Sequence, residues 1–243
     1  MTEGLRERKK RATRQRISDV ATGLFMARGF DNVTVAEVAR AADVSVNTVF
    51  NYFGTKEDLF ADRQDEVVEQ APRVLRERRP GESIVRAFRR DYLEAIETRH
   101  WRYGLNEGSH VFSKIVNDSP ALTARMREIA VAQEETLARA LAEELDAHPD
   151  DLTPRLVAAH LLGTTRILSE RAMTMMVAGE VWERIAPMLR EQAERAFDLL
   201  ESGLGALGRE PGGGEPSGGE PGGGERGGGG PGGGESGAQE PPA

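Results

Sequence analysis

The chain contains no cysteine, which excludes disulfide bonds, cysteine-ligated metals and thiol nucleophiles. It has no run of eighteen apolar residues, so we expect neither a transmembrane helix nor a membrane partner. The opening stretch MTEGLRERKKRATRQR is basic, but no apolar segment follows it, and it therefore does not form a secretory signal. Together these absences favour a cytoplasmic protein.

Motifs for catalysis and for cofactor binding are absent as well. No two of the four histidines, His100, His110, His148 and His160, have the i, i+4 spacing around a glutamate that zinc enzymes use. No glycine-rich phosphate loop is followed by a helix. We also find no nucleophile paired with a base, and we expect no enzyme, no metal site and no cofactor.

The net charge of −8 conceals an uneven distribution. Residues 6–16 contain seven Lys or Arg against one acid, Glu7. Residues 1–60 carry ten basic and eight acidic side chains, so the acidic excess lies in the rest of the chain. A basic leading end on an acidic protein indicates a polyanionic partner. A solvated basic arm without a partner is the alternative.

The C-terminal segment has a different composition from the rest of the chain. Residues 209–243 contain sixteen glycines, with Pro and Glu recurring between them. Such a segment has no apolar side chains to offset the entropy lost on ordering, so we predict that residues 208–243 form a disordered tail without a site. Two domains, residues 1–60 and 61–207, are predicted before it.

Helical periodicity runs through both predicted domains, and no alternating strand pattern interrupts it. Thr34 and Thr55 each begin a capping box that opens a helix, and Gly29 ends the helix before the first of them. Pro72 is expected to kink or end the helix that follows Thr55. The sequence therefore predicts an all-α fold of about nine helices.

Two short helices, residues 34–42 and 46–52, are separated by a three-residue turn and form a helix-turn-helix candidate. Helical spacing places Val49 and Phe53 on the side that faces the core, with Phe50 at its border. The opposite side carries two amides, a hydroxyl and a phenol, from Asn47, Thr48, Asn51 and Tyr52. Amides pair with adenine edges in the major groove, so this side is suited to reading bases. An ordinary exposed face of a helical protein is the alternative.

The stretch from about Arg16 to Phe60 resembles the DNA-binding domain of the TetR (tetracycline-repressor) family. The residues that carry the resemblance are Ala27-Arg28-Gly29-Phe30, Thr34-Val35-Ala36-Glu37-Val38-Ala39, Val44-Ser45 and Thr48-Val49-Phe50-Asn51-Tyr52-Phe53-Gly54-Thr55-Lys56-Glu57-Asp58-Leu59-Phe60. This set is more specific than a helix-turn-helix alone. The segment that follows it matches the family only in length and in being helical.

The resemblance implies an Ω-shaped homodimer that acts as a ligand-responsive one-component transcriptional regulator, usually a repressor released from DNA by its ligand. Its partners would be a palindromic double-stranded DNA operator and a small effector held by the C-terminal helical domain, which also forms the dimer interface. The positions that the resemblance places at DNA are Thr34, Ala36, Ser45, Val46, Asn47, Thr48, Phe50, Asn51, Tyr52 and Lys56.

Two positions depart from the family pattern. Asp43 stands in the turn where the family often has glycine, and Asp can adopt the left-handed conformation at small cost, so we expect the turn to persist. Asn51 replaces a residue that is often a larger ring or an imidazole. No known operator sequence can therefore be transferred to this chain.

The effector site is expected to be an adaptable apolar pocket formed by aromatic side chains and methionines. The candidates are Phe88, Tyr92, Trp101, Tyr103, His110, Phe112, Met126 and Met173. Each of them could instead be part of a plain core. The form FNYFGTKEDLF resembles a branch of the family that senses long-chain acyl-CoA esters, and Arg99, Arg102 and Lys114 would suit a phosphate-bearing ligand.

Apolar stripes on the last two long helices indicate a dimer interface. The stripe residues are Leu156, Ala159, Gly163 and Ile167 on the first helix, and Ile185, Leu189, Ala193, Ala196 and Leu200 on the second. Small residues let helices approach closely, which suits a four-helix interface between two chains. Packing within one chain is the alternative.

Two other functions are compatible with the same residues. A sequence-independent architectural DNA-binding protein without a ligand would use the basic end and the helix-turn-helix without base readout. An activator or a quorum-type sensor cannot be separated from a repressor by sequence.

Overall fold

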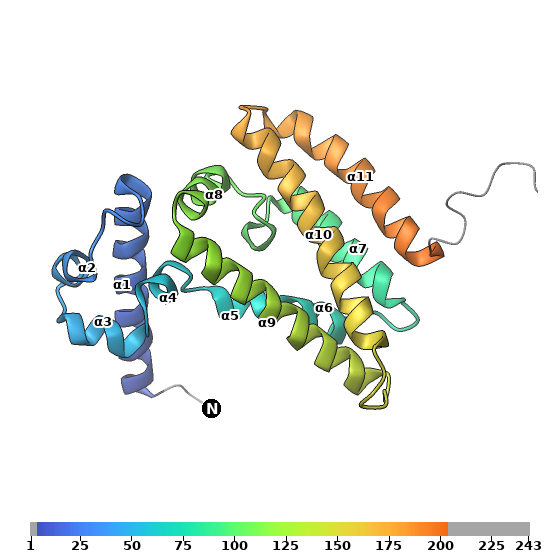
Figure 1. Ribbon diagram of the computed structural model, residues 1–243, viewed down its shortest axis with the longest axis horizontal. Helices are drawn as coiled ribbons and strands as arrows, with labels where there is room; N and C mark the ends of the chain where they lie inside the picture. The colour runs from blue at the N-terminus through green and yellow to red at the C-terminus, as the bar shows by residue number, and fades with distance from the viewer. Residues whose placement is uncertain (1–3, 204–243) are drawn as a thin grey trace, which may run out of the picture. The chain divides into compact units, whose positions relative to one another are not determined.

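The computed structural model describes residues 4–203, which are helical apart from the connections between helices (Figure 1). The all-α prediction is confirmed, with no strand among these residues. The eleven α-helices and one 3₁₀ turn of this range are α1 (Leu5–Arg28), α2 (Val35–Ala41), α3 (Val46–Tyr52), α4 (Lys56–Phe60), α5 (Gln64–Val68), α6 (Gln70–Arg76), α7 (Ile84–Thr98), η1 (Trp101–Tyr103), α8 (Ser109–Asp118), α9 (Pro120–Glu144), α10 (Thr153–Val177) and α11 (Trp182–Ser202). The predicted tail, residues 208–243, lies outside the described range.

The helices beyond the expected nine arise where the sequence predicts one long helix after the second capping box. A turn through Asp62 separates α4 from α5. α5 ends at Val68, four residues before Pro72, because a proline has no N–H for the Val68 carbonyl and its ring crowds that oxygen. The expected effect of Pro72 is thus confirmed. α6 restarts at Gln70 with the proline in its first turn, where no helical N–H bond is required.

The start and stop signals of the short helices are found where the sequence predicts them. The side chains of Thr34 and Thr55 accept hydrogen bonds from the amides of Glu37 and Asp58, and both capping boxes are complete. Gly29 ends α1 with a φ of 79°. Helices of five to seven residues are unstable alone, so these caps and the packing around them hold the helices in place.

The first of two hydrophobic cores holds α1–α4 together. The rings of Phe25, Phe30 and Phe60 contact one another, with centroids 5.2 to 5.7 Å apart. Ile115 of α8 and Leu122 of α9 are buried in the same core. The predicted domain boundary at residue 60 therefore stays a prediction, because side chains from both sides of it share this core and residues 4–203 lie in one compact unit.

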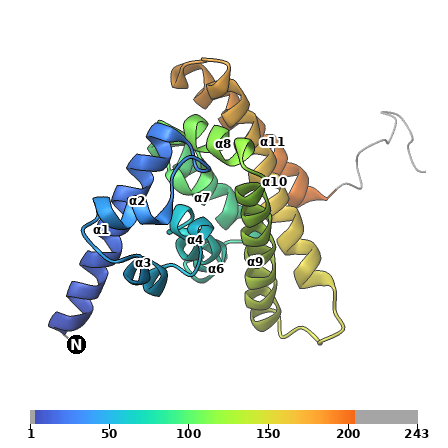
Figure 2. The same cartoon turned by 60° about the vertical axis from the view of Figure 1, so that its left-hand side comes forward.

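The second core lies among α6, α7, α9, α10 and α11. α10 contacts both α9 and α11, and α7 packs against α11; Figures 1 and 2 both show α10 beside α11. Ile185, Leu189 and Ala193 of α11 are fully buried there. The prediction that these three residues form a dimer interface is wrong, since they pack within their own chain. Leu156 and Ile167 of α10 are instead 55% and 60% exposed.

No helix within residues 4–203 combines the length and the apolar character needed to span a bilayer.

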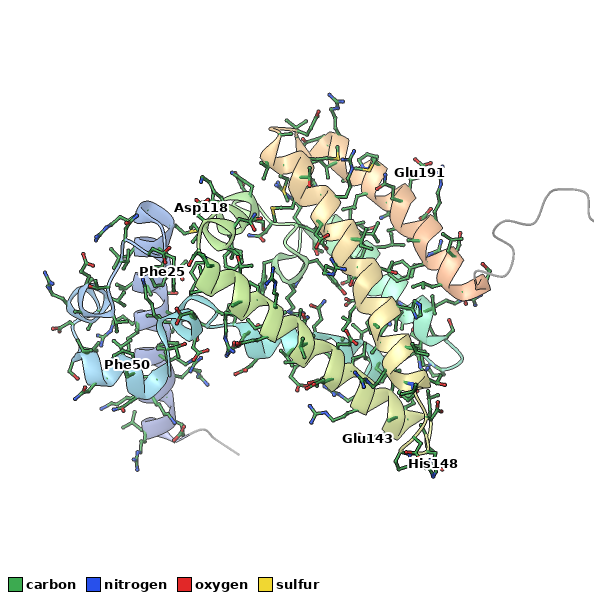
Figure 3. The ribbon with its side chains drawn as sticks, in the orientation of Figure 1. Phe25, Phe50, Asp118, Glu143, His148 and Glu191 are labelled. Carbon is green, nitrogen blue, oxygen red and sulfur yellow. The ribbon has the colours of Figure 1, made fainter. Side chains whose placement is uncertain are left out.

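Phe25 and Phe50 form a matched pair that tests the first core. Phe25 is fully buried in α1, whereas Phe50 of α3 is 46% exposed (Figure 3). We expect Phe25→Ala to lower the free energy of unfolding by about 3–5 kcal/mol, because it removes buried apolar area and leaves a cavity. Phe50→Ala should lower it by about 1 kcal/mol at most. Urea unfolding followed by circular dichroism measures the free energy of unfolding of both variants. An equal decrease in the two would contradict this placement of the core.

Candidate nucleic-acid interface and effector cavity

α3 is packed on one side and exposed on the other. Val49 and Phe53 are 1% and 2% exposed, as their spacing predicts, so they fix the helix against the first core. Among the sequence-predicted DNA positions, the exposed side of α3 and its cap carries Ser45, Val46, Asn47, Phe50 and Asn51. This side combines two amides, a hydroxyl and two apolar groups, which are the groups that read base edges and thymine methyls in a major groove.

Two of the residues predicted on this side are partly buried instead. Tyr52 packs against the first core. The hydroxyl of Thr48 lies 2.8 Å from that of Ser45, within the N-terminal cap of α3. Asp43 adopts the left-handed conformation with a φ of 53°, as expected for the turn before α3. The exposed side is therefore more apolar than the sequence predicts, because Val46 and Phe50 take the place of Thr48 and Tyr52.

Two further predicted DNA positions lie at the start of α2 and are exposed: the N-cap residue Thr34 and Ala36 in the first turn. The amide and the hydroxyl of Thr34 both donate to the carboxylate of Glu37 at 2.8 Å. These two hydrogen bonds, with a weaker contribution from Arg28, lower the pKa of Glu37 to about 2. The Thr34 hydroxyl is thus engaged in capping α2.

Lys56, the predicted phosphate contact, is engaged within the chain. Its ammonium donates to the Phe30 carbonyl at 2.7 Å and lies 4.1 Å from the centroid of the Phe30 ring. Burial lowers the pKa of Lys56. A lysine ammonium has three donors and this bond uses one of them, so the phosphate contact stays a prediction.

Arg14 of α1 connects the end of α3 to the turn after α4. Its guanidinium donates to the Tyr52 carbonyl at 3.0 Å and to Asp62 Oδ1 at 2.6 Å, and it lies 4.6 Å from the centroid of the Phe53 ring. We call this set, Arg14, Tyr52, Phe53 and Asp62, the Arg14 anchor. Because α1 begins at Leu5, the basic residues 6–16 form its first turns and are not a free arm.

The Arg14 anchor was not predicted from the sequence. The available signal was that Arg14 precedes Ile17 and Ala21 by three and seven residues, which places all three on the core-facing side of α1. Nothing in the sequence indicated the partner, because Asp62 is 48 residues away.

A cavity of about 670 Å³ lies next to this anchor, and Asp62 is part of its wall. Segments of α1, α8, α9 and α10 line it, together with η1 and the turn between α4 and α5. Five predicted effector residues are in the wall: Trp101, Tyr103, Phe112, Met126 and Met173. Phe60 of α4 also lines the cavity and stacks on Phe112 with ring centroids 4.8 Å apart, a contact not predicted from the sequence.

The other three predicted effector residues lie elsewhere. Phe88 lines a smaller adjoining cavity of about 300 Å³. Tyr92 is fully buried in the second core, where its hydroxyl lies 3.3 Å from that of Ser169, and burial raises its pKa. His110 is exposed on α8 and lines neither cavity.

A second charged link joins the cavity helices to the helix-turn-helix region. Arg125 of α9 lies 2.7 Å from Asp58 of α4 and donates to Gln64 of α5 at 2.7 Å. The side chain of Asp58 also accepts a hydrogen bond from the amide of Thr55 in the capping box of α4. Gln64 and Met126, the residue after Arg125, are both in the cavity wall. The Arg125 link therefore reaches the cavity, as the Arg14 anchor does through Asp62.

Within the described part of the chain, no three His, Asp or Glu side chains are gathered in a way that could hold a metal ion.

An exposed helix-turn-helix beside a cavity is the arrangement of a DNA-binding regulator, and comparison with known proteins assigns the family. The family model described as bacterial regulatory proteins, tetR family, matches residues 17–62. The HTH-type transcriptional regulator TcmR of Streptomyces glaucescens is 30% identical over 219 residues, which cover 86% of this chain and 92% of TcmR. The chain belongs to the tetR family of bacterial regulatory proteins.

Two further comparisons agree with this assignment. The HTH-type transcriptional regulator LuxR of Vibrio harveyi is 40% identical over 62 residues, 26% of this chain and 30% of LuxR. The solved structure of a SmeT–triclosan complex matches with a TM-score of 0.52 at 18% identity, covering 79% of this chain and 90% of that one. At this identity the match shows a shared fold.

Asp62→Asn tests the Arg14 anchor, because the change in affinity for DNA has opposite signs with and without a role for the anchor. Removal of an acidic charge alone strengthens binding to DNA. The amide oxygen of asparagine can accept a hydrogen bond from Arg14 but carries no charge, so the ion pair is lost. The weaker contact should instead loosen the end of α3, and we expect affinity for the DNA upstream of the gene to fall about tenfold. Fluorescence anisotropy at one fixed salt concentration measures the change.

Asp65→Asn is the matched control, because Asp65 is exposed on the neighbouring helix α5 and its replacement removes the same charge. We expect it to bind as the unmodified protein does or slightly more tightly. If Asp62→Asn behaved like this control, the anchor would have no part in DNA binding.

Proposed function

We propose that this protein is a cytoplasmic one-component transcriptional repressor that binds a palindromic operator as a homodimer and is released by a small, largely apolar effector. The observation that carries the proposal is the shared position of Asp62. It lines the cavity and it also bonds Arg14, which holds the end of α3. Occupancy of the cavity and placement of the DNA-reading helix thus depend on one residue.

Base readout is assigned to the exposed side of α3. Asn47 and Asn51 present amides that can pair with adenine edges, while Val46 and Phe50 offer apolar contact to thymine methyls. The basic first turns of α1 supply charge for the phosphates. Backbone contacts position a protein on DNA and base contacts give it specificity, so both sets are needed for an operator.

The homodimer is assigned to the outer side of α10. Leu156 and Ile167 are more than half exposed there, and the small residues Ala159 and Gly163 lie between them in the sequence. An exposed apolar side with small residues suits close approach of the same helix from a second copy. Two-fold symmetry would place the two α3 helices about 34 Å apart, one turn of duplex, in the Ω-shaped arrangement that the family resemblance implies.

The effector is assigned to the larger cavity, whose volume and aromatic lining are those of a small-molecule site. A ligand against Phe112 and the turn at Asp62 would displace this turn and weaken the Arg14 anchor. Coupling of about 1–3 kcal/mol between two sites is typical and lowers operator occupancy several-fold or more. SmeT, which shares the fold, forms a complex with triclosan.

A sequence-independent architectural DNA-binding protein is the second candidate, since the seven Lys and Arg of residues 6–16 alone suffice for phosphate binding. The two candidates differ in their specificity ratio. Anisotropy with the protein's own upstream DNA and with a scrambled duplex, at one fixed salt near physiological, measures it. A preference of about a thousandfold or more supports the operator-binding regulator. Equal, weak binding to both duplexes would contradict it.

Asn47→Ala and Asn51→Ala test the assignment of base readout. Each should relax the preference at one or two positions of the operator by about 1–3 kcal/mol while the fold is kept, because each removes one bidentate donor and acceptor pair. Selection from randomised duplexes measures the preference. Asn117→Ala, an exposed asparagine on α8, is the control and should leave it unchanged. Unchanged preference in both α3 variants would contradict the assignment.

A further inference from the structure

Arg102 is a positively charged residue in the walls of both cavities. It lies on η1, and its guanidinium is 5.8 Å from the centroid of the Trp101 ring. Its Nε is buried without a hydrogen-bond partner, and among residues 4–203 its side chain forms no ion pair. Buried donors in proteins are normally bonded, and a partly buried cation without a carboxylate is costly, so an anion from outside the chain would satisfy this group.

The other charged residues in the wall of the larger cavity differ from Arg102. Arg63 donates twice to Glu66 at 2.8 Å, and Arg166 donates to Glu170 at 2.8 Å. Asp62 is bound by Arg14. Glu107 has its side chain exposed to water, which screens its charge. Within residues 4–203, Arg102 is thus the cation of this wall that forms no salt bridge; the carboxylate whose pKa it also helps to lower, that of Glu66, is already bound by Arg63.

We propose that the effector carries one anionic group, a carboxylate or a sulfonate, on an aromatic or extended apolar body, and that Arg102 binds this group. This inference rests on the proposed function, because it names the ligand class of the same cavity. The body lies against Phe112, Met126 and Met173, and the anion lies at the boundary between the larger and the smaller cavity, which Arg102 lines on both sides. Arginine presents a planar fork that binds a carboxylate with two hydrogen bonds.

One unpaired cation fits a ligand with one anionic group better than an acyl-CoA ester, which carries several phosphates. Of the three cations that the sequence suggested for a phosphate-bearing ligand, only Arg102 lines either of these two cavities. Arg99 lies 5.1 Å from the centroid of the Trp182 ring, and Lys114 pairs with Asp118 on the surface of α8. Within the described residues, the cavities thus do not offer the several free cations that the phosphates of an acyl-CoA-like effector would need.

Two fluorescent probes that differ only in the charged group test this inference. Anilinonaphthalenesulfonate and the uncharged anilinonaphthalene have the same aromatic body. In the full chain carrying Trp182→Phe, Trp101 of the cavity wall is the single tryptophan, so quenching of its emission reports binding in this cavity. We expect the sulfonate to bind at least about tenfold more tightly than the uncharged probe, as expected for a charged hydrogen bond in a partly buried site.

Substitution of Arg102 should remove this preference and leave the uncharged probe unaffected. Arg102→Gln is expected to bind both probes equally, whereas Arg102→Lys, which keeps the charge, should retain part of the preference. Arg166→Gln is the matched control: Arg166 also lines both cavities but is already paired with Glu170, so the preference should persist.

The possible results separate this inference from the proposed function. Equal binding of the two probes to the unsubstituted chain, or an equal loss of preference in Arg166→Gln and Arg102→Gln, would overturn the anion site and leave the apolar effector cavity intact. If neither probe quenched Trp101, both the anion site and the effector cavity would be wrong.

Discussion

The contact between the Arg14 guanidinium and Asp62 is the interaction on which the proposed function depends. α3 has only seven residues, too few for a helix to be stable without packing. Val49 and Phe53 fix its inner side, and Arg14 holds its last carbonyl. The exposed amides of α3 can read bases only while the helix stays in this position, so the anchor decides whether the surface exists in a form that fits DNA.

In the proposed function, the same contact links a cavity in the larger helical region to DNA binding. Asp62 lies in the turn between α4 and α5, where the chain is not helical and can move at lower cost than a helix. Arg14 is 40% exposed and Asp62 12% exposed, so their pairing is of moderate strength and can be shifted by a ligand of ordinary affinity. A buried, fully paired link would resist such a shift.

Local features of the fold could be predicted from the sequence because they depend on neighbouring residues. The capping box at Thr34, the stop at Gly29 and the left-handed Asp43 are examples, since each involves residues a few positions apart. The inward side of α3 followed from helical spacing. The Ω-shaped dimer and the individual DNA contacts stay predictions, since they concern a second chain and a nucleic acid.

Features that depend on distant packing could not be predicted in the same way. Periodicity shows that α11 has an apolar side but not what covers it, and Leu189 proved to face its own chain. Tyr92 and Tyr103 have the same chemistry, yet one is fully buried in the core and the other lines both cavities. The Arg14–Asp62 contact joins residues whose separation along the chain gives no periodic signal.

If filling the cavity moves the DNA-binding helices, the distance between the two copies of α2 in the dimer must change. Because the chain has no cysteine, Ala41→Cys, at the exposed end of α2, allows one spin label per chain. Pulsed electron–electron double resonance on the dimer gives the distance between the two spin labels, with and without saturating anilinonaphthalenesulfonate. We expect one defined distance that shifts when the probe is bound. A distance that stays the same at saturation would contradict it.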